Sequence, residues 1–427
     1  MIWLTGVLFV LFMLMGMPVG FVIAISSLAY FFTSDFLPLG IAFQKFAAPT
    51  QSFPMIAVPL FILVGNLLTR TGITERLLDF ARLLTGWMIG GLAQINVLLA
   101  MLMGGVAGSA VADASMQSRM LGFSMIERGY PRAYTAVVIA FASLITATLP
   151  PSILLILFGF VGNVSIGKLF LAGIIPGILL TITLMVTNYI MARRMKIQPE
   201  TFSKPTFKEV VVSFRRGFWA LMFPVILIVV IRLGLFTTSE AGAFIVLYAI
   251  IVGGLVYKEL TWQGILDTLT ETLSDLGIVM LLVMAAFILG HISVLDQLPQ
   301  AMTDFITDFT DNPTGIMLLI FALVLVIGMV LDASPLVLLL TPILLPIVTE
   351  LGYDPIHFGI LFVTLTLLGA NTPPVGICMY TVCGILKCDT VDFMKASVPY
   401  LIAFLIFITI LFVFPQTVMF LPDLLMP

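Results

Sequence analysis

Long runs of apolar residues limit what this chain can fold into. A helix needs about 20 apolar residues to cross the hydrocarbon core of a bilayer. Hydrophobic residues make up 61% of the sequence and charged residues only 10%, so we predict an all-α polytopic membrane protein with about nine crossings. The apolar runs lie near residues 4–32, 53–69, 87–118, 133–162, 168–192, 218–236, 241–257, 276–295, 314–349, 357–386 and 397–420.

Charge and cysteine content disfavour several other classes of protein. The 19 Lys and Arg residues against 22 Asp and Glu leave a net charge of −3, too few cations to neutralise a nucleic acid along an extended surface. Cys378, Cys383 and Cys388 are an odd number, spaced too widely for a zinc site. The stretch 162–169 resembles a phosphate-binding loop, but Leu169 stands where Ser or Thr would hold magnesium. We therefore expect no cofactor, no nucleic-acid partner and no enzyme activity.

Positive charge separates the loops into two groups. Most of the cations lie in loops that would face one side of the membrane if the runs alternate, and only Lys45, Lys168 and Arg232 fall on the other side. The positive-inside rule makes the cation-rich side cytoplasmic. This count treats 4–32 as one crossing and predicts a cytoplasmic N-terminus and a C-terminus on the opposite face. The first run lacks a basic start and a clear cleavage site, so no removed signal peptide is expected.

Two apolar stretches are predicted to enter and leave the membrane by the same face. The stretch 87–118 lies between two cation-rich segments and has a glycine-rich middle at 104–108. If the glycines divide this stretch into two helices, each helix is too short to cross the membrane. The stretch 314–349 has acidic residues at both ends and a polar break at 332–335. We therefore predict two re-entrant helical hairpins that enter from opposite faces.

Each predicted hairpin is followed by an apolar run that contains a double proline, at 150–151 and at 373–374. Proline removes a backbone hydrogen bond and clashes with the preceding turn, so both helices should be broken within the membrane. Asp-Ala-Ser occurs at 113–115 and again at 332–334, and Gly-Tyr precedes each double proline by 21 residues. Because the crossings of the two halves run in opposite directions, these marks indicate inverted repeats.

Paired broken helices in two inverted halves are typical of a transporter binding site near the membrane midplane. Carbonyls freed at the breaks, together with Ser, Thr and Asn oxygens, suit a hard monovalent cation such as sodium. The N-termini of half-helices suit a carboxylate. Our hypothesis is cation-coupled transport of a small organic anion, with sites divided between each hairpin tip and its broken helix.

Three segments carry a family resemblance: Gly104 to Ser109, Thr-Pro-Ile-Leu-Leu-Pro at 341–346 and Thr-Pro-Pro-Val-Gly at 372–376. Over essentially its whole length the chain resembles the large membrane subunit (M subunit) of TRAP transporters, the tripartite ATP-independent periplasmic systems, and is most similar to the sialic-acid type. The first tip, Gly108-Ser109-Ala110, departs from the Ser-Gly-Ser-rich tip more frequent in the family, which leaves the ligands near 105–109 open.

The resemblance implies an elevator-type fold of the ion-transporter superfamily and sodium ions as coupling ions. It also implies a multi-pass protein of the bacterial inner membrane, in contact with membrane lipid, whose C-terminus is periplasmic. The expected partners are a small four-helix membrane subunit and a periplasmic substrate-binding protein, in which most of the substrate selectivity resides.

Ion and substrate ligands are expected at the hairpin tips and the broken helices. Sodium ligands, from backbone or side chain, are predicted at Gly105, Gly108, Ser109, Asp113, Thr146, Thr148, Pro150, Asp332, Ser334, Gly369, Asn371 and Thr372. Substrate contacts are predicted at Ser109, Ser334, Pro335, Asn371, Thr372 and Gly376. Structural roles stay open: Asp332 and Ser334 would also cap a helix that starts at Pro335, Asp113 would also serve as a structural hydrogen-bond partner, and the threonines would also satisfy carbonyls freed by the prolines.

Two amphipathic segments are predicted to lie along the membrane surface as arms between a fixed scaffold and a moving domain. A channel, a membrane-embedded enzyme and a stand-alone sodium/carboxylate transporter of the same superfamily are the alternatives to a TRAP subunit. The predicted division is scaffold 1–69, arm 70–86, first half of the transport domain 87–192, cytoplasmic loop 193–217, scaffold 218–257, arm 258–275 and second half 276–427.

Overall fold

The computed structural model describes residues 2–33, 37–104, 109–201, 203–232, 236–307 and 312–426, and within these ranges the chain is almost entirely helical. Short 3-10 turns, η1 (Ala48–Gln51) and η2 (Phe53–Ile56), and π-helical turns, η3 (Ser118–Gly122) and η4 (Val252–Val256), connect or extend the α-helices. The α-helices are α1 Ile2–Leu14, α2 Val19–Thr33, α3 Leu39–Ala47, α4 Ala57–Thr69, α5 Ile73–Thr85, α6 Gly91–Leu102, α7 Ala110–Gln117, α8 Phe123–Glu127, α9 Arg132–Thr148, α10 Ile153–Val161, α11 Ile166–Arg194, α12 Phe207–Arg232, α13 Thr238–Ile251, α14 Trp262–Leu295, α15 Leu298–Thr307, α16 Pro313–Gly328, α17 Ala333–Glu350, α18 Pro355–Gly369, α19 Ile377–Leu386, α20 Thr390–Val413 and α21 Gln416–Leu425.

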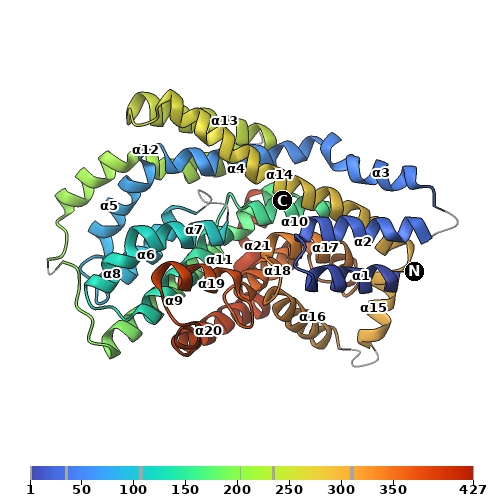
Figure 1. The fold of residues 1–427 in the computed structure, drawn as a ribbon. Coiled ribbons are helices and arrows are strands. Elements are labelled where there is room, and N and C mark those ends of the chain that lie inside the picture. The colour runs from blue at the N-terminus through green and yellow to red at the C-terminus, as the bar shows by residue number, and fades with distance from the viewer. Residues whose placement is uncertain are drawn as a thin grey trace.

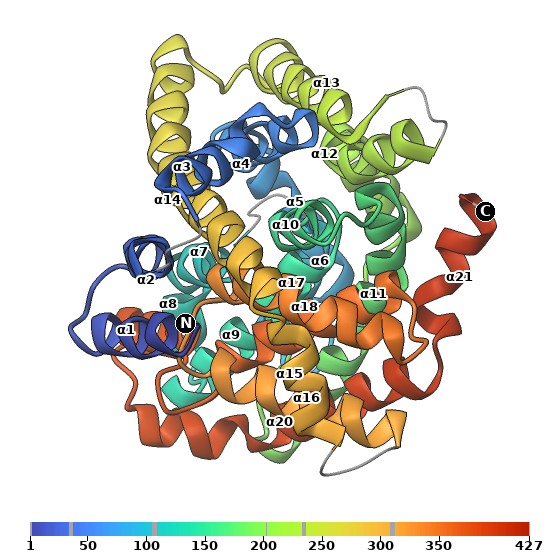
Figure 2. The same cartoon turned by 90° about the vertical axis from the view of Figure 1, so that its right-hand side faces the viewer.

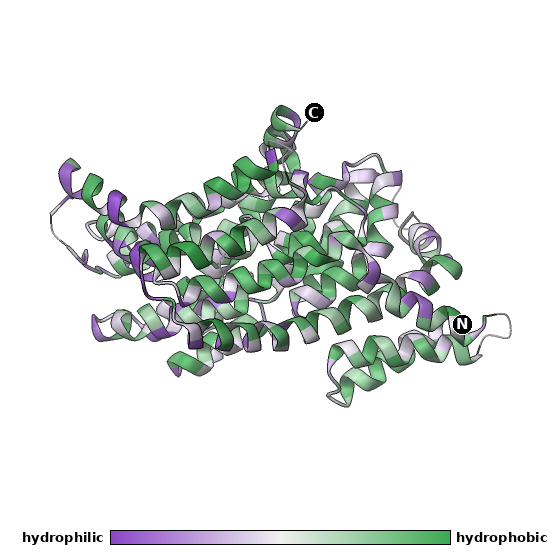
Figure 3. Cartoon of the chain, turned by 90° about the horizontal axis from the view of Figure 1, so that it is seen from above, coloured by the Kyte–Doolittle hydropathy of each residue, from purple (hydrophilic) through white to green (hydrophobic). Residues whose placement is uncertain are grey.

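The helices have the length and composition of membrane spans. In the described ranges, six helices are long and apolar enough to cross a bilayer, and two further pairs would each cross as one bent span. Hydrophobic residues cover most of the middle of the molecule, and hydrophilic residues gather towards its two ends (Figure 3). The prediction of an all-α polytopic membrane protein is confirmed.

The first apolar run does not form the single crossing predicted for 4–32. The helix stops after Leu14 because Gly16 has a φ of +77° and Pro18 has no backbone N–H to continue the ladder. The 13 residues of α1 and the 15 of α2 each extend only about 20 Å, and the two helices pack against each other (Figure 1). Residues 2–33 therefore form an antiparallel pair of helices. The count of crossings that predicted a cytoplasmic N-terminus treated this segment as one crossing, so the count no longer supports that orientation.

One side of the molecule is formed by α3, α4, α12, α13 and the first part of α14, which lie together at the top of both Figure 1 and Figure 2. In this group α13 packs on α4 and on α12. Helix α14 then contacts α2, α3, α4 and α17, so it joins this side to the remaining helices. Most residues of this group fall in the two segments predicted as scaffold.

The other helices form two halves that pack on each other reciprocally. Both hairpin arms α6 and α7 pack on α9, and both arms α16 and α17 contact α18. The second arm of each hairpin also packs on the second part of the other half's broken helix, α7 on α19 and α17 on α10. In the same way α9 packs on α20 and α18 on α11. Reciprocal contacts of this kind are what inverted repeats produce, and they confirm the predicted internal symmetry.

The first hairpin begins and ends at the same place. The amide of Leu92, at the start of α6, donates to the hydroxyl of Tyr130, which follows α8, at 3.3 Å. Glu200 joins the same two regions, because its amide donates to the carbonyl of Gly86 at 2.9 Å and its carboxylate pairs with Arg128 at 3.4 Å. The segment therefore returns to the end from which it started, as predicted for a re-entrant hairpin.

Two segment boundaries differ from the prediction. Residues 258–275 do not form a separate surface helix, because α14 continues without a break for 34 residues from Trp262 to Leu295. No proline interrupts that stretch, so its backbone ladder is not broken. The predicted loop 193–217 is shorter, since α12 begins at Phe207. By contrast, α5 is a separate helix within the predicted arm 70–86.

Candidate functional site

Both double prolines interrupt a helix at the positions that the sequence predicts. The first break separates α9 from α10 with a bend of 47°, and the second separates α18 from α19. The Pro150-Pro151 and Pro373-Pro374 bonds are both cis. Ser152 caps the new start of α10, because its Oγ accepts from the amide of Leu155 at 3.5 Å.

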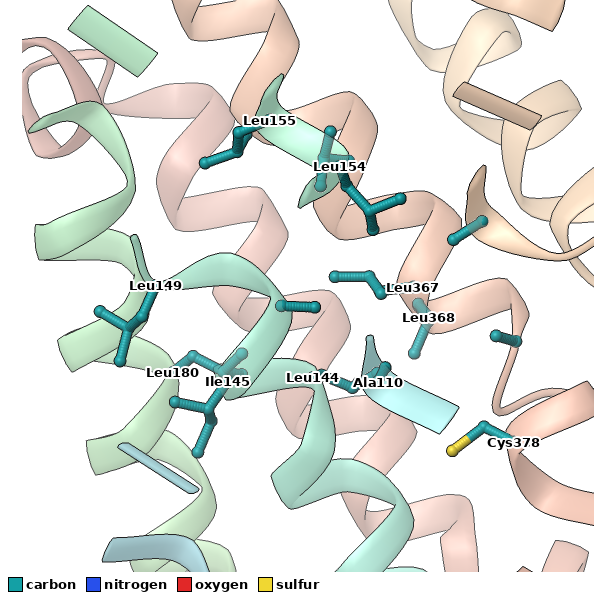
Figure 4. Packing of buried hydrophobic residues seen from close by; sticks show 14 of the residues in the cluster. Ala110, Leu144, Ile145, Leu149, Leu154, Leu155, Leu180, Leu367, Leu368 and Cys378 are labelled. Carbon is teal, nitrogen blue, oxygen red and sulfur yellow. The ribbon is translucent and has the colours of Figure 1, made fainter. Parts of the chain in front are cut away.

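The first break is buried beneath α11 and the tip of the first hairpin. A Cβ on Gly173 would lie 2.7 Å from the carbonyl oxygen of Thr148, and a Cβ on Gly177 or Gly104 would meet the side chain of Leu149. Apolar side chains from both halves, among them Leu149 and Leu368, pack around this region (Figure 4). The glycines allow backbone and side chains to approach the break closely.

The second break lies against the tip of the second hairpin. A Cβ on Gly369 would lie 2.5 Å from the backbone carbon of Gly328, so the end of α18 contacts the end of α16 backbone to backbone. The carbonyl of Met329 accepts from the amides of Val375 and Gly376 at 3.2 and 3.0 Å. The tip of the hairpin is therefore hydrogen-bonded to the start of α19, and movement of the tip would disturb the break.

Asp113 is the best-defined polar group of the first hairpin. It is completely buried, and its Oδ2 accepts from Gln117 Nε2 at 2.5 Å and from Thr146 Oγ1 at 2.8 Å. Thr146 belongs to α9, two residues before the end of that helix. The contact therefore connects the second arm of the hairpin to the broken helix.

Asn371 is the corresponding polar group of the second break. It is completely buried, and its Nδ2 donates to the carbonyl of Ala140 in α9 at 2.9 Å. Ser143 donates to the same carbonyl at 2.8 Å and lies 3.6 Å from the sulfur of Cys378. The break of one half thus contacts the helix that is broken in the other half.

Several buried oxygen atoms near these contacts lack a hydrogen-bond partner within the described residues. They are Asp113 Oδ1, Gln117 Oε1 and Asn371 Oδ1. Buried polar atoms are nearly always satisfied in proteins, so each exception asks for a ligand or a water. Carboxylate and amide oxygens are ligands for a hard cation, which makes these atoms candidates for the sodium site.

The acid of the second hairpin, Asp332, follows the tip that is hydrogen-bonded to the second break through the Met329 carbonyl. Asp332 is the N-cap residue of α17 and has extended backbone. Asp113 lies in the first turn of α7, the second arm of the first hairpin. Each Asp-Ala-Ser motif therefore lies at the start of the second arm of its hairpin.

The remaining predicted residues fall into three groups. Gly105 and Gly108 lie outside the described residues, and the structure says nothing of them. Thr148 donates to the Leu144 carbonyl of its own helix, and Thr372 donates to the carbonyl of Gly369 at the end of α18, which fits the structural role left open for the threonines. The other predicted residues lie at the break or in the first turn of a helix: Ser109 caps α7 by accepting from the amide of Ala112, Pro150 is buried at the first break, Ser334 and Pro335 lie in the first turn of α17, and Gly376 precedes α19.

Sequence reasoning missed Gln117 and Ser143. Gln117 follows Asp113 by four residues, the spacing that places two side chains on the same face of a helix, so this signal was available. Ser143 is a single polar residue within an apolar run, and only its contacts with the Ala140 carbonyl and the sulfur of Cys378 show that it lies near the site.

Inverted repeats with paired hairpins and broken helices define the chain as a multi-pass membrane transporter. The fold is similar to that in the crystal structure of the Alcanivorax borkumensis YdaH transporter, with a TM-score of 0.62 over 91% of this chain and 88% of that chain, at 15% identity. Residues 6–417 match the family described as tripartite ATP-independent periplasmic transporter, DctM component. The chain belongs to this family and is a transporter permease rather than an enzyme.

Two relatives illustrate the range of the family. The chain is 36% identical to the sialic acid TRAP transporter large permease protein SiaM of Vibrio cholerae, over 96% of this chain and 95% of the relative. It is 35% identical to the 2,3-diketo-L-gulonate TRAP transporter large permease protein YiaN of Escherichia coli, over 96% of this chain and 94% of the relative. Similarity of the same degree therefore extends to relatives named for different acids.

Proposed function

We propose that this chain is the large permease subunit of a sodium-coupled TRAP transporter that imports a sugar-derived carboxylate across the bacterial inner membrane. The relatives SiaM and YiaN are named for sialic acid and 2,3-diketo-L-gulonate, and both compounds are oxygen-rich acids. Sialic acid is the substrate to test first. The family description names a tripartite periplasmic transporter, so the expected partners are a small membrane subunit and a periplasmic substrate-binding protein.

The observation that carries sodium coupling is a pair of buried oxygens, Asp113 Oδ1 and Asn371 Oδ1, that have no hydrogen-bond partner among the described residues. Each lies at the contact between a hairpin or a break and helix α9. A cation bound to such oxygens compensates their loss of water, and it would favour the arrangement in which hairpin and broken helix are held together. Sodium binding would in this way prepare the substrate site.

An elevator movement fits the division of the molecule into two sides. The reciprocal contacts among α6, α7, α9, α10 and α16 to α20 hold the two halves together, so they would move as one body. The group of α3, α4, α12 and α13 would remain as the scaffold. Helices α5 and α14 connect the two sides, and ion pairs of Arg70 with Asp267 and Glu271 fasten the first part of α14 to the end of α4.

Uptake in proteoliposomes tests the proposal. The chain is reconstituted with its small subunit, and the binding protein and labelled sialic acid are added outside, with and without an inward sodium gradient. We expect accumulation against the substrate gradient that requires both sodium and the binding protein. Uptake without sodium would overturn the coupling, uptake without the binding protein would favour a stand-alone transporter, and flux only down the substrate gradient would favour a channel.

A matched pair of variants then locates the ion site. Thr146→Val removes the hydroxyl that donates to Asp113, whereas Thr183→Val removes one that donates only within its own helix, to the carbonyl of Leu179 at 2.8 Å. The first variant should raise the sodium concentration for half-maximal uptake, and the second should leave it unchanged. Equal behaviour of the two variants would contradict an ion site at Asp113.

A further inference from the structure

A large cavity lies away from the transport site, between α5, the first half of α12 and the segment that follows α13. Its volume is about 930 Å³. It lies towards the end of the molecule that carries most of the cations, beside the charged first turns of α12 that precede its apolar part. None of its lining residues belongs to the hairpins or the broken helices.

The two helical walls of this cavity carry opposite charge. The α5 wall presents Glu75 and Asp79, and the α12 wall presents Lys208, Arg215 and Arg216. In the part of the chain that the structure describes, the three cations of the α12 wall form no ion pair with any acid. On the α5 wall, Asp79 has only a long contact of 3.9 Å to an arginine of its own helix.

The remaining charged groups of the lining are already engaged. Arg76 pairs with Glu259 at 2.8 Å and stacks over the ring of Tyr257 at 3.8 Å. Glu209 accepts from the backbone amide of Thr206 at 2.8 Å, at the start of α12. What is left for a ligand is therefore an acidic wall opposite a basic wall.

The two helices that form the walls pack on each other beside the cavity. Phe80 and Phe214 join α5 to α12 through a ring contact of 6.4 Å between centroids, and the rest of the two helices packs around it. Opposite charges that could meet would pair directly, but here a cavity separates them. A ligand with a negative and a positive group at its two ends would satisfy both walls at once.

The surroundings of the cavity indicate that this ligand comes from the membrane. Leu83, Val212 and Val256 contribute apolar lining, and Trp219 lies at its edge with 42% of its surface exposed. Exposed aromatic residues at the end of a span are typical of the headgroup region of a bilayer. Phe218, also exposed, continues this aromatic surface along α12.

We propose that this cavity binds the phosphoethanolamine headgroup of a zwitterionic phospholipid. The phosphate lies on the basic α12 wall, where Arg215 and Arg216 supply guanidinium donors that match its oxygens. The primary ammonium donates to Glu75 and Asp79 on the α5 wall. A phosphatidylglycerol headgroup would bring no cation to the acidic wall, and a choline headgroup would have no N–H to donate to it. The bound lipid bridges α5 to α12 and so joins the connecting helix to the scaffold.

Lipid binding to the purified full chain tests this assignment. Short-chain phosphatidylethanolamine, phosphatidylglycerol and phosphatidylcholine, and soluble glycerophosphoethanolamine, are titrated into the detergent-solubilised protein, and the thermal unfolding midpoint is followed. Two double variants remove one wall each, Arg215→Gln with Arg216→Gln and Glu75→Gln with Asp79→Asn. The matched control is Arg193→Gln with Arg194→Gln, which removes two neighbouring cations outside the cavity.

We expect phosphatidylethanolamine to stabilise the wild type and the control at similar concentrations, and each wall variant to need at least tenfold more. The acidic-wall variant should also lose its preference for phosphatidylethanolamine over phosphatidylglycerol. Native mass spectrometry of the retained lipid gives a second readout that does not depend on the unfolding midpoint. Unchanged retention in both wall variants, or equal stabilisation of the wild type by phosphatidylglycerol, would overturn the assignment, and equal stabilisation by soluble glycerophosphoethanolamine would overturn a membrane source.

Discussion

Replacing Gly369 by alanine tests how tightly the second hairpin tip is held at the second break. The added Cβ would lie 2.5 Å from the backbone carbon and 2.7 Å from the Cα of Gly328, whereas carbon atoms pack without strain at about 3.5–4.0 Å. Both partners are backbone atoms, so no side-chain rotation relieves the contact. The tip of α16 must therefore move away from α18 by about 1 Å, which typically costs about 1–3 kcal/mol in a packed core.

Gly384→Ala is the matched control, because a Cβ on Gly384 would meet nothing within 4 Å. Gly384 lies within α19, where alanine is favoured over glycine by about 1 kcal/mol. Gly369→Ala should lower the thermal unfolding midpoint and reduce sodium-driven uptake about tenfold or more, since 1.4 kcal/mol corresponds to a factor of ten. Gly384→Ala should retain both. If the two variants behave alike in both assays, the close contact between tip and break does not matter for transport.

Three further outcomes follow from the same contacts. Asp113→Asn keeps the shape of the side chain but removes its charge, so the sodium concentration for half-maximal uptake should rise about tenfold; an unchanged sodium dependence would argue against an ion at this residue. Glu200→Gln removes the charge that accepts from both Arg82 and Arg128. Because the Glu200 side chain is only 7% exposed, the loss should be about 1–3 kcal/mol, as measured by thermal unfolding beside the exposed control Glu127→Gln. In a cysteine-free background, Ser334→Cys should react with an impermeant thiol reagent only from the face opposite to the cation-rich loops, and reaction from the cation-rich face would contradict the inverted arrangement.

The helical class, the two breaks and the inverted repeats could be predicted because their causes are local. Apolar runs of sufficient length must form helices in a bilayer, and a double proline interrupts a helix wherever the chain folds. The break at Gly16 and Pro18 had the same kind of local cause, although the run 4–32 was interpreted as one crossing. The sequence pattern changes from amphipathic to apolar near residue 276, and the prediction placed a boundary there. Such a change does not by itself end a helix, so α14 continues through it.

The candidate site could be predicted in part. Asp113, Thr146 and Asn371 were expected from the motifs. In the structure, Thr146 of α9 donates to Asp113, and Asn371 donates to a backbone carbonyl of α9. Their partners could not be predicted, since Gln117 and the Ala140 carbonyl carry no motif. Within the part of the chain that the structure describes, the hydroxyl of Thr148 donates inside α9 and that of Thr372 to the last residue of α18, and no feature of the sequence distinguished them from Thr146.

By itself, the sequence determined which segments are helices, where two of them break and which residues repeat, because hydrophobic length and proline geometry act within a few turns of the chain. Only the tertiary structure decided which oxygens are buried without a partner and which charges face each other across a cavity. Those properties depend on residues far apart in the chain, such as Asn371 beside Ala140 or Glu75 opposite Arg215. The burial of these oxygens and the separation of these charges arise from the packing of whole helices, and the pattern of residues along the chain does not predict that packing.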